Sequence, residues 1–429
     1  MFRKKILFFL GCLVSTSLFA QSNNPYSFVE SAYSKTEFSP QITNNASRFP
    51  GQKITDNNWS RDFTVPGVVD GPIYAMATDG ANLYVGGRFS VAGSILANGV
   101  AKWDGHKWAS LGEGENNGVS EGNNFVQTLA FIEGKLFVGG SFKYAGRKLA
   151  WGVAYWDGAD WQTLGNPEEG LRIISVFSEG DTLLHPGHVS ALGAYNHRII
   201  FGGNFNLAGT KKATGVAAWN LQTNEWESFE GGLGSHSTAN AYAFAPQGND
   251  LYVGGNFDVA GSIPAKGLAK WNGNHWSEVG GGANGMVYDL AFDQSGNLLV
   301  AGTFDSIGTI KASGVARWNH TAWEALGDAN FAEEGSKPFV KKISLFNNQV
   351  YVSGSINYID GQPAWGKARW DGSRWTTVGG EIGFAHGLWS GGINAMEVVG
   401  GRLYVGGDFT KAADTYAINL AYWDETSSD

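Results

Sequence analysis

The sequence NLYVGGRFSVAG, which begins at Asn82, returns as NDLYVGGNFDVAG from Asn249 and as GRLYVGGDFTKAA from Gly401. An apolar stretch followed by a doublet of small residues occurs seven times. The doublets begin at Gly86, Gly139, Gly202, Gly254, Ala301, Ser353 and Gly406. A tryptophan follows 17 residues after each of these positions: Trp103, Trp156, Trp219, Trp271, Trp318, Trp370 and Trp423. Because chance does not produce seven equal offsets, the chain is an array of repeats.

A second tryptophan follows the first in six repeats: Trp108, Trp161, Trp226, Trp276, Trp323 and Trp375. The offset is five residues, except in the third repeat, where it is seven. Trp423 has no such follower. However, Trp59, in NNWSRDF, precedes the first doublet in a segment that resembles KWASLG and HWSEVG. The N-terminal side of the array therefore offers the part that the last repeat lacks.

Each repeat predicts four short strands, because apolar positions alternate with small or polar ones and glycine is frequent. In the first repeat these are PIYAMA (72–77), NLYVGGRF (82–89), GVAKWD (99–104) and KWASLG (107–112). Four-stranded repeats of about 50 residues are typical of propeller blades. We therefore predict an all-β fold, a seven-bladed β-propeller of four-stranded blades over residues 59–424. An N-terminal strand around Trp59 would complete the last blade and leave no free sheet edge.

Three features of the repeat have structural interpretations. The doublets should let neighbouring strands or blades pack where a side chain would clash, and the paired tryptophans should lie in the core between blades. Asp or Asn follows every first tryptophan, from Asp104 to Asp424, often with Gly next. WDG and WNG predict two-residue hairpin turns with positive φ at both central residues. These side chains are then turn formers, and a catalytic role is the weaker alternative.

The repeat pattern LYVGGxFxxAG…GxAxWDGxxWxxLG resembles kelch-type propellers, although kelch repeats usually carry Tyr and then Trp at the two aromatic positions. It is more similar to secreted bacterial propeller repeats and to the propeller of the fungal cortical cell-polarity marker family. The resemblance extends over about residues 59–424. It implies the propeller fold and an extracytoplasmic setting, and it brings no catalytic motif.

Residues 1–20 have the order of a secretory signal peptide. Arg3, Lys4 and Lys5 precede the apolar run 6–14, and small residues lead to a cleavage site after Ala20. An uncleaved membrane anchor, or a lipoprotein site at Cys12, is a weaker alternative. We expect a protein that is secreted, periplasmic or on the cell surface. Residues 21–58, rich in Ser, Asn and Thr, should be a linker or a loosely docked arm, and 425–429 a tail.

The cysteine count and the net charge limit the classes of partner that the chain can have. Cys12 is the only cysteine, so cleavage would leave no disulfide and no cysteine-ligated metal. Residues 1–20 hold three of the 30 basic and none of the 39 acidic residues, so the mature chain has 27 against 39, a formal charge of −12. With no dense basic run, this argues against nucleic acid and anionic lipid as partners. We expect a monomer that has no cofactor and no transmembrane segment after cleavage.

The connections from the fourth strand of one blade to the first strand of the next vary most in length, and in a propeller they share a face with the loops between second and third strands. Binding usually evolves on such variable loops. On this face the second and sixth repeats carry aromatic residues where the first repeat has Val91 and Asn98. The candidate ligand-binding residues are Tyr144, Trp151, Tyr358 and Trp365, followed by His386 and Trp389 on the rim. The alternatives are local stacking that stiffens each loop, and duplication of one blade.

The longest connection, residues 165–188, contains His185 and His188. Their spacing would allow a metal pair, but no carboxylate cluster of suitable spacing accompanies them. We therefore interpret them as two exposed loop histidines, and we predict no metal site.

The first strand of each blade should line a central channel. The predicted channel-lining residues are Tyr74, Gln127, Tyr242, Tyr288, Asp289, Lys341, Lys342 and Asn394. A lone acid, Asp289, does not make the paired carboxylates of a glycosidase. The sequence has no G-x-S-x-G, P-loop or dinucleotide-binding fingerprint.

Two classes of function remain. The favoured hypothesis is a non-catalytic binding or adhesion scaffold outside the cell, which recognises a glycan or a surface protein on its long-loop face. The alternative is a secreted carbohydrate-active enzyme, a hydrolase or a lyase, with its site at the mouth of the channel.

Overall fold

Antiparallel β-strands make up the fold. A computed structural model describes residues 70–120, 125–166, 169–176, 182–234, 239–327, 331, 338–359, 362–383 and 392–424, all within the unit Lys53–Asp429. In these residues the secondary structure is strand apart from one 3-10 turn, η1 (Gly114–Asn116). The all-β prediction is confirmed. The predictions for residues 1–20 and 21–58, for the strand around Trp59 and for 425–429 lie outside the described residues.

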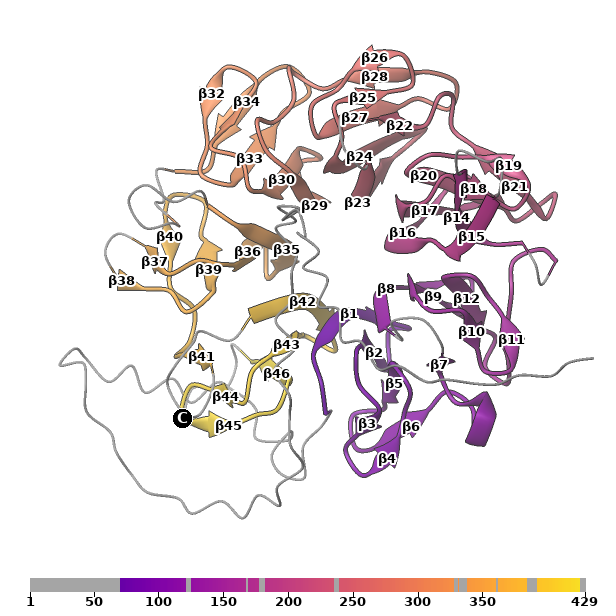
Figure 1. The fold of residues 1–429 in the computed structure, drawn as a ribbon. Helices are drawn as coiled ribbons and strands as arrows, with labels where there is room; N and C mark the ends of the chain where they lie inside the picture. Colours follow the sequence, from indigo (N-terminus) through magenta and orange to yellow (C-terminus); the bar gives the residue numbers. More distant parts are fainter. Residues whose placement is uncertain are drawn as a thin grey trace, which may run out of the picture. The chain divides into compact units, whose positions relative to one another are not determined.

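Seven antiparallel sheets, numbered here as repeat sheets 1 to 7, repeat along this part of the chain (Figure 1). Each has its strands in sequence order. Sheet 1 contains β1 (Ile73–Thr78), β2 (Leu83–Gly87), β5 (Val100–Trp103) and β6 (Trp108–Ser110); sheet 2, β8 (Phe125–Ile132), β9 (Lys135–Ser141), β12 (Val153–Trp156) and β13 (Trp161–Gln162). Sheet 3 contains β16 (His188–Tyr195), β17 (Arg198–Asn204), β20 (Val216–Asn220) and β21 (Glu225–Ser228); sheet 4, β23 (Asn240–Gln247), β24 (Asp250–Asn256), β27 (Leu268–Trp271) and β28 (Trp276–Glu278). Sheet 5 contains β29 (Val287–Phe292), β30 (Leu298–Gly302), β33 (Val315–Trp318) and β34 (Trp323–Ala325); sheet 6, β35 (Val340–Phe346), β36 (Gln349–Gly354), β39 (Lys367–Trp370) and β40 (Trp375–Thr376); sheet 7, β42 (Gly392–Val399), β43 (Arg402–Asp408) and β46 (Leu420–Trp423).

The second and third strands of each repeat sheet are joined by a small hairpin, which we call an outer hairpin. The outer hairpins are β3 (Val91–Ala92) with β4 (Ile95–Leu96), β10 (Tyr144–Ala145) with β11 (Lys148–Leu149), β18 (Leu207–Ala208) with β19 (Lys211–Lys212), β25 (Val259–Ala260) with β26 (Ile263–Pro264), β31 (Ser306–Ile307) with β32 (Ile310–Lys311), β37 (Tyr358–Ile359) with β38 (Gln362–Pro363), and β44 (Lys411–Ala412) with β45 (Thr415–Tyr416).

Strands from the long connections pair with these hairpins. They are β7 (Val119–Ser120), β14 (Leu171–Val176), β22 (Leu233–Gly234) and β41 (Ile382–Gly383), which pair with β10, β18, β25 and β44; β15 (Thr182–Pro186) pairs with β14. The prediction that the connections share a face with the loops between second and third strands is confirmed for these four. We call the outer hairpins and these strands the long-connection face.

The hydrophobic core is divided among the contacts between consecutive repeat sheets. One cluster joins Ala75 and Tyr84 of sheet 1 to Val126 and Leu129 of sheet 2, and the other sheets are joined in the same way. A further cluster joins Ile73 of sheet 1 to residues of sheet 7. The first strands contact one another in turn, and β42 contacts β1. Each sheet is therefore stabilised by its neighbours rather than by a core of its own.

The glycine doublets allow these contacts, as predicted. A Cβ on Gly254, the first residue of its doublet, would lie 2.5 Å from Cγ1 of Val287 in the next sheet. A Cβ on Gly255, the second, would overlap the Asn240 carbonyl oxygen of its own sheet. Side chains are thus excluded from both positions by backbone and neighbouring strands.

The tryptophan pairs also lie between sheets. In each of six pairs the two rings are 5.0–5.5 Å apart between centroids. The second tryptophan donates its indole N–H to a carbonyl just after the fourth strand of the preceding sheet: Trp161 to Leu111 (3.0 Å), Trp276 to Glu230 (3.0 Å), Trp323 to Gly280 (2.9 Å) and Trp375 to Leu326 (2.5 Å). The exception is Trp226, in the repeat with the longer offset, whose buried Nε1 has no acceptor among the described residues.

The turns after the first tryptophans differ from the prediction. Trp103 pairs directly with Trp108, so the loop has four residues, and positive φ is found at Gly105 (95°) but not at Asp104. The Asp104 carboxylate instead accepts the backbone N–H groups of His106 and Lys107. In sheet 6 the Asp371 carboxylate accepts the backbone N–H groups of Ser373 and Arg374, and these bonds lower the pKa of Asp371 to about 2. These acids are turn formers, as expected, but they act through side-chain acceptance rather than through a left-handed backbone.

The indole hydrogen bonds give the first testable prediction. Replacing Trp276 with Phe keeps an aromatic ring but removes the bond to Glu230, so we expect the free energy of unfolding to fall by about 1–2 kcal/mol more than the change of ring size alone explains. Trp226→Phe is the matched control, because it makes the same change at a buried indole that has no acceptor in the described chain. Urea unfolding of both variants measures the difference, and equal losses would contradict the proposed role of the bond.

Candidate functional site

The first strand of every repeat sheet carries a bulge at the same point, opposite the glycine doublet. In sheet 1, for example, Ile73 pairs with Gly87 and Ala75 with Gly86, so Tyr74 has no partner. The bulged residues are Tyr74, Gln127, Ser190, Tyr242, Tyr288, Lys341 and Asn394. Six of the seven were predicted to line the channel, and Ser190 was not. A bulge re-aims a side chain and is common beside functional sites.

Side chains from adjacent bulges touch one another. The rings of Tyr242 and Tyr288 are stacked, with centroids 5.1 Å apart and planes at 20°. The Lys341 ammonium donates to Oδ1 of Asn394 (2.7 Å), whose Nδ2 donates to the carbonyl of Ile73 (3.0 Å). The structure thus brings together two pairs of the predicted residues.

Tyr74 and Gln127 are placed on the same row but outside these pairs. The Tyr74 ring lies edge-on to Phe125, with centroids 5.8 Å apart, and burial raises the pKa of its hydroxyl. Gln127 is half-buried on β8. The predicted residues are therefore distributed over the first strands of six sheets, with the polar contacts concentrated in sheets 5 to 7.

A second inner position follows each bulge and carries charge in only two sheets. It is Ala, or once Thr, in sheets 1–4 and 7, but Asp289 in sheet 5 and Lys342 in sheet 6. The Lys342 ammonium lies 3.5 Å from Oδ1 of Asp289, and Oδ2 of the same carboxylate accepts the backbone N–H of Ile343 (2.9 Å). Asp289 therefore links two sheets while it neutralises part of the lysine charge.

A further carboxylate, Glu397, lies near Lys342 and was missed by the sequence reasoning. It is on β42, opposite Tyr404, where the other sheets have Ala, Gly or Ser. Burial raises the pKa of Glu397 to about 7, against a smaller lowering by Lys342. Asp289 is thus not a lone acid in this region. The departure of Glu397 from small residues at the same register was the signal that could have found it.

The lysine beside this cluster is also perturbed. Burial and, to a smaller extent, the charge of the adjacent Lys342 lower the pKa of Lys341 to about 8. At neutral pH the Lys341 ammonium is still mostly protonated, while Glu397 titrates. The described cluster of two lysines, Asp289 and Glu397 can therefore attract an anion and exchange a proton close to pH 7.

On the long-connection face, the predicted aromatic residues occupy equivalent places in sheets 2 and 6. Tyr144 and Tyr358 lie on outer hairpins, where they pair across strands with Leu149 and Pro363. Tyr358 is exposed, whereas Tyr144, Trp151 and Trp365 are half-buried. Of the four predicted residues, the structure thus leaves Tyr358 exposed and the other three partly accessible.

Both tryptophans adopt a left-handed backbone conformation. The φ angle is 48° at Trp151 and 52° at Trp365, whereas the equivalent residues of the other sheets have ordinary φ values. A bulky residue at positive φ is an outlier and costs about 1–2 kcal/mol. The indole Nε1 of Trp151 is also buried without an acceptor in the described chain. Two loops thus share a strained conformation that folding does not require elsewhere.

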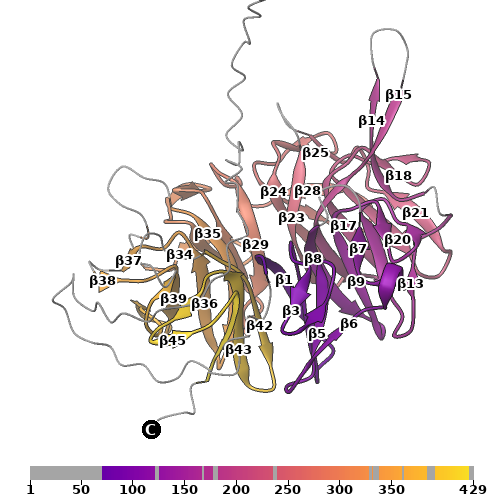
Figure 2. The same ribbon diagram turned by 60° about the horizontal axis from the view of Figure 1, so that its bottom comes forward.

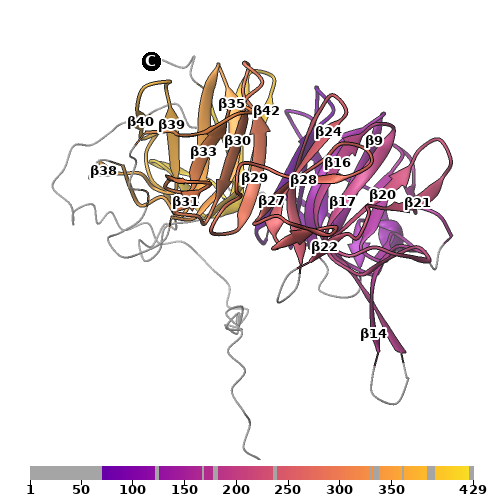
Figure 3. The same ribbon diagram turned by 90° about the horizontal axis from the view of Figure 1, so that it is seen from above.

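The exposed large hydrophobic side chains of the described residues all lie on the long-connection face. They are Leu96 (71% exposed), Leu183 (48%), Tyr358 (44%), Tyr416 (42%) and Leu184 (40%). Leu183 and Leu184 belong to the hairpin β14–β15, which projects beyond the repeat sheets in Figures 2 and 3. The sequence reasoning had identified the long insertion but not its hairpin, since alternation is weak in RIISV and TLLHP.

The two histidines of the insertion are separated by the structure. His185 is exposed on β15, whereas His188 is half-buried on β16 with its ring 5.4 Å from that of Phe125, and burial lowers its pKa. Neither is in a loop and His188 is not exposed, which corrects that prediction. Within the described residues no group of three metal-ligating side chains occurs. His386 and Trp389 lie outside the described residues.

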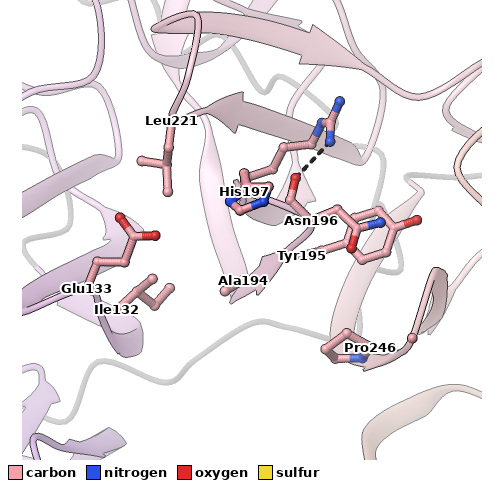
Figure 4. A pocket seen from close by; sticks show the side chains of 10 residues that line it. Ile132, Glu133, Ala194, Tyr195, Asn196, His197, Leu221 and Pro246 are labelled. Carbon is pink, nitrogen blue, oxygen red and sulfur yellow. Dashed lines mark hydrogen bonds between the residues drawn. The ribbon is translucent and has the colours of Figure 1, made fainter.

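At the opposite ends of the first strands, an open pocket of about 200 Å³ lies between hairpin turns of sheets 2, 3 and 4 (Figure 4). Two of its polar side chains, Arg198 and Tyr195, are held by hydrogen bonds. Arg198 donates to Glu227 (2.6 Å) and to the carbonyl of Asn196 (2.8 Å), and the Tyr195 hydroxyl donates to Asn249 (2.6 Å). Residues from three repeats form this pocket, and no local sequence signal marks it.

Comparison with known proteins supports the resemblance found in the sequence. A family model described as the Rax2 C-terminal beta propeller domain matches residues 230–398, which is less than half of the chain. The match confirms the similarity to the fungal cell-polarity marker propeller over those residues. No curated protein matches the chain.

Solved propeller structures are similar to the chain at low identity. The WD40 beta propeller domain of Doa1 has 14% identity and a TM-score of 0.47, covering 86% of this chain and 97% of that one. The designed Ika8 protein has 15% identity and a TM-score of 0.43, with coverages of 82% and 96%; YCF48 bound to D1 peptide has 10% and 0.46, with 88% and 99%. With TM-scores below 0.5, these similarities are no evidence about a function. None of the helices in the described residues could cross a membrane.

The raised pKa of Glu397 predicts a pH dependence. The folded chain holds this proton between pH 4.5 and about 7, whereas the unfolded chain releases it, so stability falls as pH rises through this window. Glu397→Gln should match the wild type near pH 4.5 and exceed it above pH 7, by up to a few kcal/mol. Urea unfolding at pH 4.5, 6 and 7.5 measures this, with the exposed Glu113→Gln as control. A difference between Glu397→Gln and the wild type that does not change with pH would show that Glu397 titrates normally.

Proposed function

We propose that the chain is a non-catalytic binding scaffold outside the cell, which recognises a surface protein or a glycan through its long-connection face. The observation that carries this proposal is the gathering there of Leu96, Leu183, Leu184, Tyr358 and Tyr416. Exposed apolar side chains that are adjacent to one another, as Leu183 and Leu184 are on β15, are typical of interaction surfaces. Because three of the five are aliphatic, and sugars are usually held by aromatic faces, the set favours a protein partner.

The rigidity of the outer hairpins supports the same function. A Cβ on Gly93 or Gly261, in two of the hairpin turns, would lie 2.8 Å from Cδ1 of Trp108 or Trp276. The hairpins are thus packed on the second tryptophan of their own sheet, which is itself anchored in the core. A surface held in this way loses little conformational freedom when a partner binds, which favours affinity.

The strained tryptophans support a glycan as the second candidate ligand. Trp151 and Trp365 have positive φ angles in two sheets, whereas the equivalent residues of the other sheets do not have this strained backbone conformation. Backbone strain of this kind is found mainly at functional sites. Each tryptophan follows an outer hairpin that also carries a tyrosine, so two equivalent aromatic sites would be available to an extended ligand.

An extracellular location follows from the basic, apolar and small-residue order of residues 1–20. We also propose that the seven repeat sheets are blades of a closed ring, in which the segment around Trp59 supplies the fourth strand of sheet 7. Contact of β42 with β1 supports closure. So does the hydrogen bond from Nδ2 of Asn419 to the carbonyl of Gly71 (2.8 Å).

A carbohydrate-active enzyme is the alternative, and one observation favours it. Asp289 and Glu397 both interact with Lys342, and Glu397 has a pKa suited to a general acid. A pair of carboxyl groups, one of them a general acid with a raised pKa, is typical of glycoside hydrolases. Hydrolysis of any polysaccharide by the wild type, lost in Glu397→Gln, would support this alternative over the scaffold.

Ring closure predicts a role for residues 57–63. Their deletion would remove the fourth strand of sheet 7 and Trp59, and the loss of one buried tryptophan alone costs about 3–5 kcal/mol. We expect a melting temperature lower by about 5 °C or more. Deletion of residues 31–37, within the predicted linker, is the control of equal length and should change little. An unchanged melting temperature after deletion of 57–63 would show that the ring closes without this segment.

The binding face predicts which side chains carry affinity. The quadruple variant L96S/L183S/L184S/Y358S should reduce binding of the mature chain to cell-envelope proteins about tenfold or more, because apolar anchors at interfaces commonly contribute about 2 kcal/mol each. Its melting temperature should stay nearly unchanged, since all four side chains are exposed. Titration onto intact envelope preparations, before and after protease treatment, measures the effect and identifies a protein ligand.

The control variant is H106S/K107S, in a turn between third and fourth strands away from the long-connection face. It should bind as the wild type does. If protease treatment leaves binding intact and W151A/W365A removes it, the ligand is a glycan. Binding that persists in both sets of variants would contradict the assignment of this face.

A further inference from the structure

The inner positions of sheets 5 to 7 carry a polar cluster that the scaffold function does not use. We propose that Lys341 and Lys342, together with Asn394, form a binding site for the carboxylate group of an acidic sugar. This site is on the first strands, separate from the exposed apolar residues of the long-connection face, so the two proposals can fail independently.

The bulge places both ammonium groups in one site. In a regular strand, adjacent side chains point to opposite faces. At the β35 bulge, Lys341 contacts Asn394 of sheet 7 and Lys342 contacts Asp289 of sheet 5, and the charge of Lys342 is close enough to lower the pKa of Lys341. The two ammonium groups therefore lie between the same neighbouring first strands, β29 and β42.

The electrostatics of the cluster favour an anion. Lys342 faces one carboxylate, Asp289, and interacts with a second, Glu397, which burial keeps partly protonated near pH 7, while the polar partner of Lys341 is the neutral Asn394. Burial disfavours the charged form of Lys341, and a bound carboxylate would stabilise that charged form. Lys342 keeps 34% of its side chain exposed, so a ligand can reach the pair from solvent. The chain as a whole is acidic, so this pair of lysines is a local basic site on an acidic protein.

The charged residues of the cluster also occupy positions at which most other sheets have small residues. At the position of Lys342 five other sheets have Ala or Thr, and at the position of Glu397 the other six have Ala, Gly or Ser. The fold is therefore built in most sheets without charge at these positions. Desolvating charged groups costs stability, so their presence on three consecutive sheets points to a function.

An aromatic wall adjoins the lysines and suits a sugar ring. Tyr288 stacks on Tyr242 and lies edge-on to Phe339, with centroids 5.2 Å apart. Phe339 is two residues before Lys341. A pyranose ring packed against these residues would place a carboxylate on its C5 within the reach of the ammonium groups, which donate charge-assisted hydrogen bonds. A neutral sugar would make the apolar contact alone.

The experiment compares an acidic with a neutral oligosaccharide on the full mature chain. Calorimetric titration with galacturonic acid trimer should show saturable binding, while maltotriose should bind at least about tenfold more weakly. K341M/K342M should lose the preference for the acidic trimer. As an independent readout in the wild type, the trimer should protect Lys341 and Lys342 from acetylation, measured by mass spectrometry.

The matched control is K211M/K212M, the adjacent lysine pair on the outer hairpin β19, which removes the same charge from an exposed place. This variant should keep the preference. Equal binding of the two trimers, equal affinity for inorganic sulfate, or an equal loss in both double variants would overturn the proposal. If K341M/K342M does not fold, the acetylation experiment decides, since unprotected lysines in the presence of saturating trimer would also overturn it.

Discussion

Close approach between consecutive sheets at the glycine doublet is the constraint on which the rest of the structure depends. Each doublet lies where the second strand of one sheet meets the first strand of the next, and a Cβ added at Gly254 would lie 2.5 Å from Cγ1 of the buried Val287. Because the core lies between sheets, this spacing determines how much apolar surface each interface removes from water. Only Gly, Ala301 and Ser353 occur at the first doublet position of the seven sheets, so this position carries at most a small side chain in this chain.

The same doublet creates the inner positions. Its second residue lies beside the first-strand carbonyl at the bulge, and the bulge turns one residue of each first strand out of the regular pairing. Tyr, Gln, Ser, Lys and Asn all occur among the bulged residues, so the fold does not specify them. A backbone feature that all seven sheets share thus produces a row of side chains of varied chemistry. The lysines, Asp289 and Glu397 lie on that row or next to it.

The outer hairpins separate recognition from stability in a different way. They pack on the second tryptophan of their sheet, and four of the seven also pair with strands from the long connections, which fixes their backbone. Their outward side chains, such as Leu96 and Tyr358, are exposed and contribute little to the core. Changes there can alter binding without loss of the fold. The inner positions are more restricted, because any charge placed on them must be desolvated.

The sequence by itself determined the repeat, the four strands of the first unit, the all-β class and the structural role of the doublets and tryptophan pairs. It could do so because these features depend on local alternation and on equal spacing, which are visible along the chain. It also named six of the seven bulged residues, since they occupy one register in every repeat. The turn type was wrong, because side-chain acceptance by Asp104 replaces a left-handed backbone and no composition rule separates the two.

What only the tertiary structure decided is which residues of different repeats meet. Glu397 and Asp289 are far apart in sequence, and their common neighbour Lys342 is known only from the order in which first strands contact. Likewise, the positive φ angles of Trp151 and Trp365, the half-burial of Tyr144 and the projection of β14–β15 depend on how loops pack against the sheets. Sequence spacing specifies the strands because they repeat a local pattern, whereas contacts between repeats arise from packing, which one-dimensional spacing does not contain.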